Sequence, residues 1–246
     1  MNLTEHPRLL ARVAGAFYVI ITASALFAYM YVRRQVIIPG DMAQTATNIL
    51  AHERLYRLGF SAAVVTVLCN PPMGFILYEL LKIVNPRIAL LSLVFITIST
   101  TIEAVNLFTY ITPLFIFSLP EYRAAFGPAE LQALARGTIK LWGYVFSVSL
   151  SFFGVFCLLT GYLLFKSKFF PRVLGVLMAI AGAYYLTNYS FVEFLGLPEI
   201  PYIGMLRPTL VGEVALALWL LVVGVNETKW LAQAHALQNQ NGSSLS

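Results

Sequence analysis

Charged residues are scarce in this sequence of 246 residues. They make up 11% of the chain, against 59% for the hydrophobic class, and the mean hydropathy is +0.78. A soluble domain of this length needs a more polar surface, so we expect lipid around most of the chain. The only two cysteines, Cys69 and Cys157, lie inside apolar runs, which excludes a disulfide framework.

The motifs of many soluble enzymes are absent as well. The sequence has no phosphate-binding glycine loop, no nucleophile elbow and no His-Glu-x-x-His zinc motif. Its histidines, His6, His52 and His235, lie outside the apolar runs, which argues against a haem or histidine-ligated metal in a membrane. We therefore expect no cofactor and no metal. The formal charge of +5 is spread over many connections, which fits membrane topology better than nucleic-acid binding.

Six long apolar segments are present, and each approaches or exceeds the roughly 20 residues that cross a hydrocarbon core. We expect helices near Leu10–Val32, Arg57–Val84, Ile88–Leu119, Thr138–Phe165, Val173–Leu195 and Pro208–Val225. The predicted fold is all-α, an integral membrane bundle of six transmembrane helices. Residues 1–226 form one polytopic membrane domain in this prediction. The polar residues 227–246 form a disordered cytoplasmic tail.

Basic residues in the short connections predict the orientation. Lys82 and Arg87 flank one tight turn, and a second turn carries Lys166 and Lys168 without an acid. Short basic turns belong in the cytoplasm, so both termini are predicted to be cytoplasmic. Arg33 and its neighbour Arg34 follow the first helix on the predicted outer side and argue the other way.

Two outer connections show helix-start signals. Asp41 and Gln44 have the spacing of a capping box, and Pro128 suits a first helical position with Glu130 near the positive helix end. These signals predict two short interfacial helices, which are either lids over a site or ordinary connectors.

Small residues recur at spacings of four in two segments. They are Gly143, Ser147 and Ser151 in the fourth segment, and Gly175, Ala179 and Ala183 in the fifth. Because small side chains let helix backbones approach closely, these stripes predict helix contacts.

Four polar residues form a regular stripe in the third segment. Ser99, Glu103, Asn106 and Tyr110 are spaced by four, three and four, which places them on one helical face. A carboxylate in hydrocarbon costs roughly 2.5–3.5 kcal/mol, so it must face protein or water. The segment contains no basic residue that could pair with Glu103. We predict that this stripe lines a ligand-binding site.

Other polar residues fall at similar predicted depths. Asn70 precedes two prolines, which remove backbone hydrogen bonds and predict a break in the second helix. Asn188 and Glu213 lie in the fifth and sixth segments, and Arg207 is a predicted ion-pair partner of Glu213 or Glu193. Asn70, Asn188 and Glu213 complete the predicted ligand-binding set. Kinked helix packing without a ligand is the alternative interpretation.

Several sequence runs resemble a bacterial family of multi-pass membrane proteins that is described only as domain of unknown function 4386. The runs are Ala11–Gly15, Ile38–Asp41, Phe170–Leu177 and Leu210–Leu220, of which the Pro-Gly-Asp and Pro-Arg-Val-Leu-Gly motifs are the more specific. The resemblance covers nearly the whole chain up to Asn226. It implies a multi-pass protein of the bacterial cytoplasmic (inner) membrane, and it implies no activity.

Three functions are consistent with these patterns. The first is binding or movement of a small amphipathic molecule through a polar pocket open to the outer leaflet. The second is an intramembrane enzyme that uses Glu103 as general acid and Glu213 as second carboxyl on a lipid or isoprenoid. The third is a structural or accessory membrane subunit. The expected partners are membrane lipids and a small amphipathic ligand, and nucleic acid is not expected.

Overall fold

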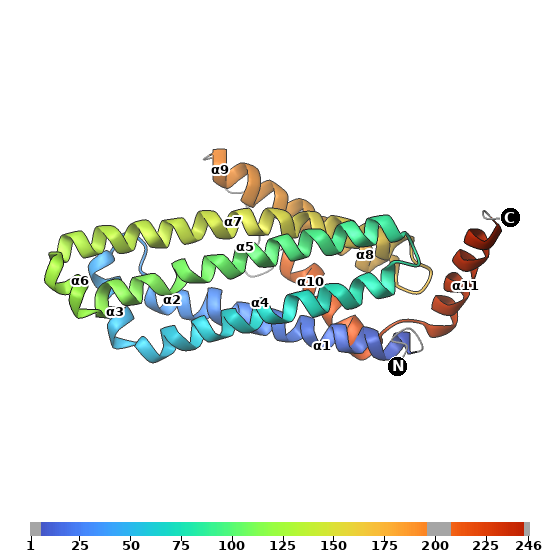
Figure 1. Ribbon diagram of the computed structural model, residues 1–246, viewed down its shortest axis with the longest axis horizontal. Coiled ribbons are helices and arrows are strands. Elements are labelled where there is room, and N and C mark those ends of the chain that lie inside the picture. Colours follow the sequence, from blue (N-terminus) through green and yellow to red (C-terminus); the bar gives the residue numbers. More distant parts are fainter. Residues whose placement is uncertain (1–5, 196–207, 244–246) are drawn as a thin grey trace. The chain divides into compact units, whose positions relative to one another are not determined.

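The computed structural model describes residues 6–195 and 208–243, and all regular structure within these ranges is helical (Figure 1). The label η marks a π-helix. In chain order the helices are α1 (Pro7–Ala25), η2 (Leu26–Val32), α2 (Arg33–Val36), α3 (Met42–Ala51), α4 (Glu53–Leu81), α5 (Pro86–Ser118), α6 (Pro120–Ala125), α7 (Pro128–Lys166), α8 (Arg172–Tyr185), η3 (Leu186–Val192), α9 (Glu193–Leu195), α10 (Pro208–Val222) and α11 (Glu227–Ser243).

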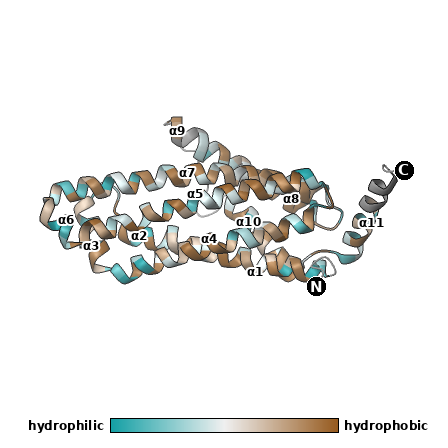
Figure 2. Cartoon of the chain, viewed as in Figure 1, coloured by the Kyte–Doolittle hydropathy of each residue, from teal (hydrophilic) through white to brown (hydrophobic). Residues whose placement is uncertain are grey.

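Five helical segments of the described ranges are long and apolar enough to cross a membrane. They are Pro7–Val36, Glu53–Leu81, Pro86–Ser118, Pro128–Lys166 and Arg172–Ser190. A sixth is reached if α10 and α11, which meet at a bend of 98°, count as one span. Figure 2 shows apolar residues along most of these helices, with hydrophilic residues gathered around α6 and along much of α11. The chain is a multi-pass membrane protein, with five or six spans where the sequence predicted six.

The exposed surface of α5 agrees with a lipid environment. Phe108 is 74% exposed and Val105 is 61% exposed, whereas Glu103, Asn106 and Tyr110 are buried. A helix in water shows the opposite distribution, with apolar residues inside. The polar stripe therefore faces protein, as the sequence predicted.

The prediction of a broken second helix is wrong. Pro71 and Pro72 lie inside α4, which is helical from Glu53 to Leu81. Pro113 likewise lies inside α5 and does not end it. Each proline removes one N–H, but leaving the helix would expose many more backbone groups to hydrocarbon. The surrounding helical bonds therefore keep the segment helical.

The connections before α4 and α7 match the prediction in part. Asp41 caps α3, and its carboxylate accepts the Gln44 backbone N–H at 2.9 Å, as predicted. Pro128 does begin a helix, but that helix is α7 itself, which continues to Lys166. The second short helix is α6 and lies before Pro128. The interfacial position of these helices and the orientation of the termini stay predictions.

The structure has a helix where the sequence predicted a disordered tail. The Asn226 side chain accepts the backbone N–H of Lys229 at 3.1 Å and caps the start of α11. The indole N–H of Trp230 donates to the Leu80 carbonyl at 3.0 Å. A polar composition alone predicts no packing, but one buried tryptophan is enough to hold the first turn of this helix against α4.

The chain divides into two compact units, and the predicted domain boundary at residue 226 stays a prediction. The first unit contains Met1–Val19, Cys69–Ser99 and Leu150–Ser246, and the second contains Ile20–Leu68 and Thr100–Ser149. The long helices α1, α4, α5 and α7 contribute residues to both units.

Small residues bring α7 and α8 close together in the first unit. A Cβ atom on Gly161 would lie 2.8 Å from the Gly175 carbonyl oxygen and 2.8 Å from the Ala179 backbone nitrogen. The predicted contact at Gly175 and Ala179 is thus confirmed. The predicted contact at Gly143 is wrong, because a Cβ atom there would meet nothing within 4 Å.

We expect Gly161→Ala to destabilise the protein by about 1–3 kcal/mol, because the new methyl group meets backbone that cannot rotate away. Gly143→Ala on the same helix is the matched control. It should leave stability unchanged or raise it by about 0.5–1 kcal/mol, because alanine favours helix more than glycine does. Thermal unfolding of both variants in detergent checks this. Equal midpoints for the two variants would contradict the close approach of α7 and α8.

Candidate functional site

A tyrosine and a carboxylate form the centre of the polar stripe in the second unit. The Tyr29 hydroxyl donates to Glu103 Oε1 at 2.7 Å. Glu103 is only 8% exposed. The described residues form two ion pairs, Arg57–Glu53 and Lys82–Glu79, and neither includes Glu103. A neutral donor, rather than a cation, therefore accompanies this carboxyl group.

The next two residues of the stripe are held by backbone groups. The Asn106 side-chain amide donates to the Trp142 carbonyl at 3.0 Å, and the Thr109 hydroxyl contacts the Asn106 side-chain oxygen. The Tyr110 hydroxyl donates to the Ala28 carbonyl at 3.4 Å. Because both Asn106 and Tyr110 are buried, these bonds satisfy polar groups that lipid could not.

Aromatic rings surround this polar core. The Tyr29 ring lies 5.6 Å from the Trp142 ring and 6.4 Å from the Tyr110 ring, measured between centroids. The Arg33 guanidinium lies 3.6 Å from the centroid of the Trp142 ring and 6.0 Å from that of Tyr110. A cation at such distances is attracted by the negative face of the ring. We call Tyr29, Arg33, Glu103, Asn106, Tyr110 and Trp142 the Glu103 centre.

A π-helical segment positions two members of the Glu103 centre. Tyr29 lies in η2, and Arg33 follows directly after it. A π-helix bonds each N–H to a carbonyl five residues back, which changes the direction in which later side chains point. Ala28, whose carbonyl accepts from Tyr110, belongs to the same segment.

The other predicted site residues belong to the first unit. Ser99 is buried, and Asn188 is buried within η3. Asn70 is buried, and its side-chain oxygen has no hydrogen-bond partner among the described residues. Glu213 accepts the Tyr185 hydroxyl at 2.5 Å. The seven predicted residues thus fall into two groups, and only Glu103, Asn106 and Tyr110 lie within the second unit.

The predicted ion pair of Arg207 with Glu213 or Glu193 stays a prediction. Arg207 and the side chain of Glu193 lie outside the described residues. Within the described ranges, Tyr185 bonds Glu213 in the way that Tyr29 bonds Glu103. Glu103 and Glu213 thus each accept a hydrogen bond from a tyrosine hydroxyl.

The comparison with known proteins identifies the family. The family model described as Domain of unknown function (DUF4386) matches residues 13–224. The chain belongs to this family. No curated protein matches the chain, and no solved structure matches it either. The match agrees with the resemblance seen in the sequence.

Three members of the Glu103 centre were not predicted for this DUF4386 protein. Tyr29, Arg33 and Trp142 lie in different sequence segments from the stripe, and only the packing of the helices brings them into the Glu103 centre. Two arginines at the end of an apolar run were a visible signal, but Arg33 and Arg34 were interpreted only as topology residues. Within the described ranges, no group of three or more His, Cys, Asp or Glu residues could hold a metal ion.

The Glu103 centre combines a carboxyl group with aromatic faces. Carboxylates accept hydrogen bonds and attract cations, and aromatic faces attract cations as well. The described residues place one cation, Arg33, on the rings but not on Glu103. The centre is thus chemically suited to a cationic group or to a hydrogen-bond donor.

We expect Tyr29→Phe to destabilise the protein by about 1–3 kcal/mol, because it leaves a buried carboxyl oxygen without its donor. Tyr31→Phe is the matched control on the same helix. Tyr31 is 53% exposed, so its variant should change stability by no more than about 0.5 kcal/mol. Thermal unfolding of the purified variants measures both effects. Equal losses would mean that the Tyr29–Glu103 bond adds no stability.

Proposed function

We propose that this membrane protein binds or moves a small amphipathic molecule whose polar end is cationic and reaches the Glu103 centre. The observation that carries the proposal is the Arg33 guanidinium 3.6 Å from the centroid of the Trp142 ring. Tyr29, whose ring also packs on Trp142, donates a hydrogen bond to the buried Glu103, and Glu103 forms no ion pair within the described ranges. Arg33 acts in this proposal as an internal occupant, which a ligand displaces from the rings.

The proposed direction of entry is the outer leaflet. It depends on cytoplasmic termini, which the basic connections support through Lys82, Arg87, Lys166 and Lys168. In that orientation η2 and the start of α4 lie toward the outer side. The resemblance to a bacterial family supports a location in the bacterial cytoplasmic membrane.

If the ligand displaces Arg33, removal of this arginine should strengthen ligand binding rather than weaken it. Arg33→Gln removes the competing cation, so it should raise the affinity for the lipophilic cation tetraphenylphosphonium by about tenfold. Glu103→Gln removes the attracting charge and should lower that affinity by a similar factor. Equilibrium binding to the purified full-length protein measures both changes.

Two controls match these variants. Arg34→Gln removes an exposed arginine one position away, and Glu53→Gln removes an exposed carboxylate of the same unit. Neither should change the affinity. If Arg33→Gln and Glu103→Gln only lower the thermal unfolding midpoint and leave binding unchanged, the Glu103 centre is structural, and the accessory-subunit hypothesis replaces the proposal.

The enzyme hypothesis has one observation in its favour. Both Glu103 and Glu213 accept a tyrosine hydroxyl, and a hydrogen-bonded carboxyl group can exchange a proton with a bound substrate. A reaction on a lipid or isoprenoid then requires at least one of these carboxyl groups. We expect Glu103→Gln and Glu213→Gln, separately and together, to abolish any lipid product that appears on expression of the protein. An unchanged lipid profile in the double variant would exclude the hypothesis.

A further inference from the structure

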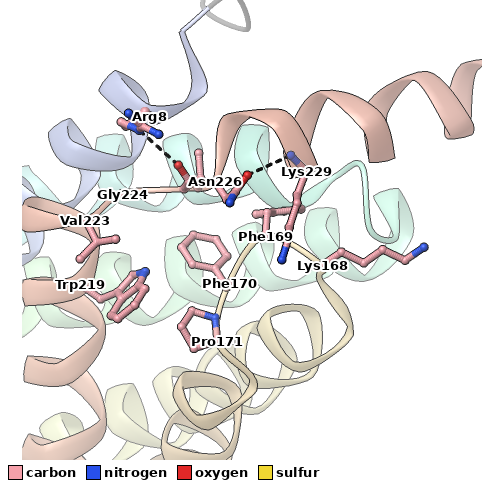
Figure 3. Close-up of a pocket in the computed structure, with 11 residues that line it drawn as sticks. Arg8, Lys168, Phe169, Phe170, Pro171, Trp219, Val223, Gly224, Asn226 and Lys229 are labelled. Atoms are coloured by element: carbon pink, nitrogen blue, oxygen red, sulfur yellow. Dashed lines mark hydrogen bonds between the residues drawn. The ribbon is translucent and has the colours of Figure 1, made fainter.

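A basic pocket lies in the first unit, and none of the residues of the Glu103 centre lines it. It has a volume of about 380 Å³ and is lined by the start of α1, the connection between α7 and α8, and the region where α10 passes into α11 (Figure 3). Three basic residues, Arg8, Lys168 and Lys229, line it, and no acidic residue does. We call this the Trp219 pocket.

Among the described residues, the basic residues of the Trp219 pocket have no carboxylate partner. None of the three takes part in an ion pair within the described ranges. Lys168 and Lys229 also line a neighbouring cavity of about 360 Å³ that contains no acid. Like charges gathered in one place repel, and at a membrane surface they attract anions.

The Arg8 side chain already makes one hydrogen bond within the protein. Its Nε–H donates to the Val225 carbonyl at 3.5 Å, near the end of α10. A guanidinium has five N–H donors, so this single long bond does not exhaust it. The neighbouring Arg12 donates to the Val222 carbonyl at 3.2 Å. These arginines hold the end of α10 against α1, and Arg8 still presents donors to the pocket.

The Trp219 indole N–H is a second reason, independent of charge, to expect a ligand in this pocket. The indole N–H of Trp219 is buried and has no hydrogen-bond partner among the described residues. Figure 3 shows the Trp219 nitrogen on the side of the ring that is turned toward Phe170. A buried donor without an acceptor is costly, so an acceptor atom from a ligand would remove that cost.

The walls around these donors are apolar. Phe169, Phe170 and Pro171 line one part of the pocket, and Val223 lines another. Next to them along the chain, Val173 is 59% exposed and Val222 is 65% exposed. In a membrane protein such exposed valines face lipid chains. A ligand with a negative head and hydrocarbon chains therefore matches the pocket and its surroundings better than a free anion does.

We propose that the Trp219 pocket binds the phosphate headgroup of an anionic phospholipid. The phosphate oxygens accept from the Trp219 indole N–H and pair with Arg8, Lys168 and Lys229, while the acyl chains lie over Val173 and Val222. A zwitterionic headgroup is disfavoured, because its ammonium group would approach the same lysines. This inference does not depend on the function proposed for the Glu103 centre.

Native mass spectrometry of the full-length protein tests the inference with phosphatidylglycerol and phosphatidylcholine. The wild-type protein should retain phosphatidylglycerol in clear preference. The double variant Lys168→Gln/Lys229→Gln should reduce that preference by about tenfold. Neither ammonium group forms an ion pair within the described ranges, so the fold should persist. The matched control Arg136→Gln/Lys140→Gln removes two exposed charges of α7 and should change nothing.

A second variant separates the pocket from general surface charge. Trp219→Phe keeps an aromatic ring but removes the N–H, so it should weaken phosphatidylglycerol binding several-fold without any change in charge. Equal retention of the two lipids by the wild-type protein overturns the proposal, as does an equal loss in the control pair. If inorganic phosphate binds as tightly as phosphatidylglycerol and displaces it, the pocket is a free-phosphate site and the lipid assignment is wrong.

Discussion

Polar groups of a membrane-spanning chain must find their partners inside the protein, because lipid offers none. Helix α5 shows the consequence, since Val105 and Phe108 are exposed while Glu103 and Asn106 are buried. Each buried polar residue then needs a donor or acceptor from another helix. Glu103 takes the hydroxyl of Tyr29, and Asn106 takes the carbonyl of Trp142. The arrangement of the second unit follows from these pairings as much as from apolar packing.

Irregular helical segments supply part of this pairing. In η2, Tyr29 turns toward α5 and the Ala28 carbonyl accepts the Tyr110 hydroxyl, so one π segment both donates to the stripe and accepts from it. In the first unit, η3 carries Asn188 and also Ser190, whose hydroxyl contacts Ser151 on α7 at 2.7 Å. A local change of helical period turns polar side chains toward the protein interior. It also keeps the backbone groups hydrogen-bonded, which a chain surrounded by lipid needs.

The spans and the inward stripe could be predicted from the sequence, because long apolar runs and a period near 3.6 residues are local properties. The continuity of α4 through Pro71 could not be predicted from the sequence. The local effect of a proline favours a break in the helix, and only the apolar surroundings of the segment favour an unbroken helix. The helical tail was missed for a similar reason, because the Trp230 contact with Leu80 depends on two distant segments. Tyr29 and Trp142 were missed because no spacing within one segment reveals a partner on another.

The arrangement of charge within the second unit is the main support for the ligand-binding role that we propose for the Glu103 centre. Arg33 and Glu103 belong to the same unit, and a direct ion pair between them would fix the helices without any ligand. The described residues instead place Arg33 on the ring of Trp142 and give Glu103 a tyrosine. The cation and the carboxyl group thus each have a neutral neighbour. In the proposed function, the cationic end of a ligand replaces Arg33 on the rings and gains an interaction with Glu103 that no ion pair within the described ranges already provides.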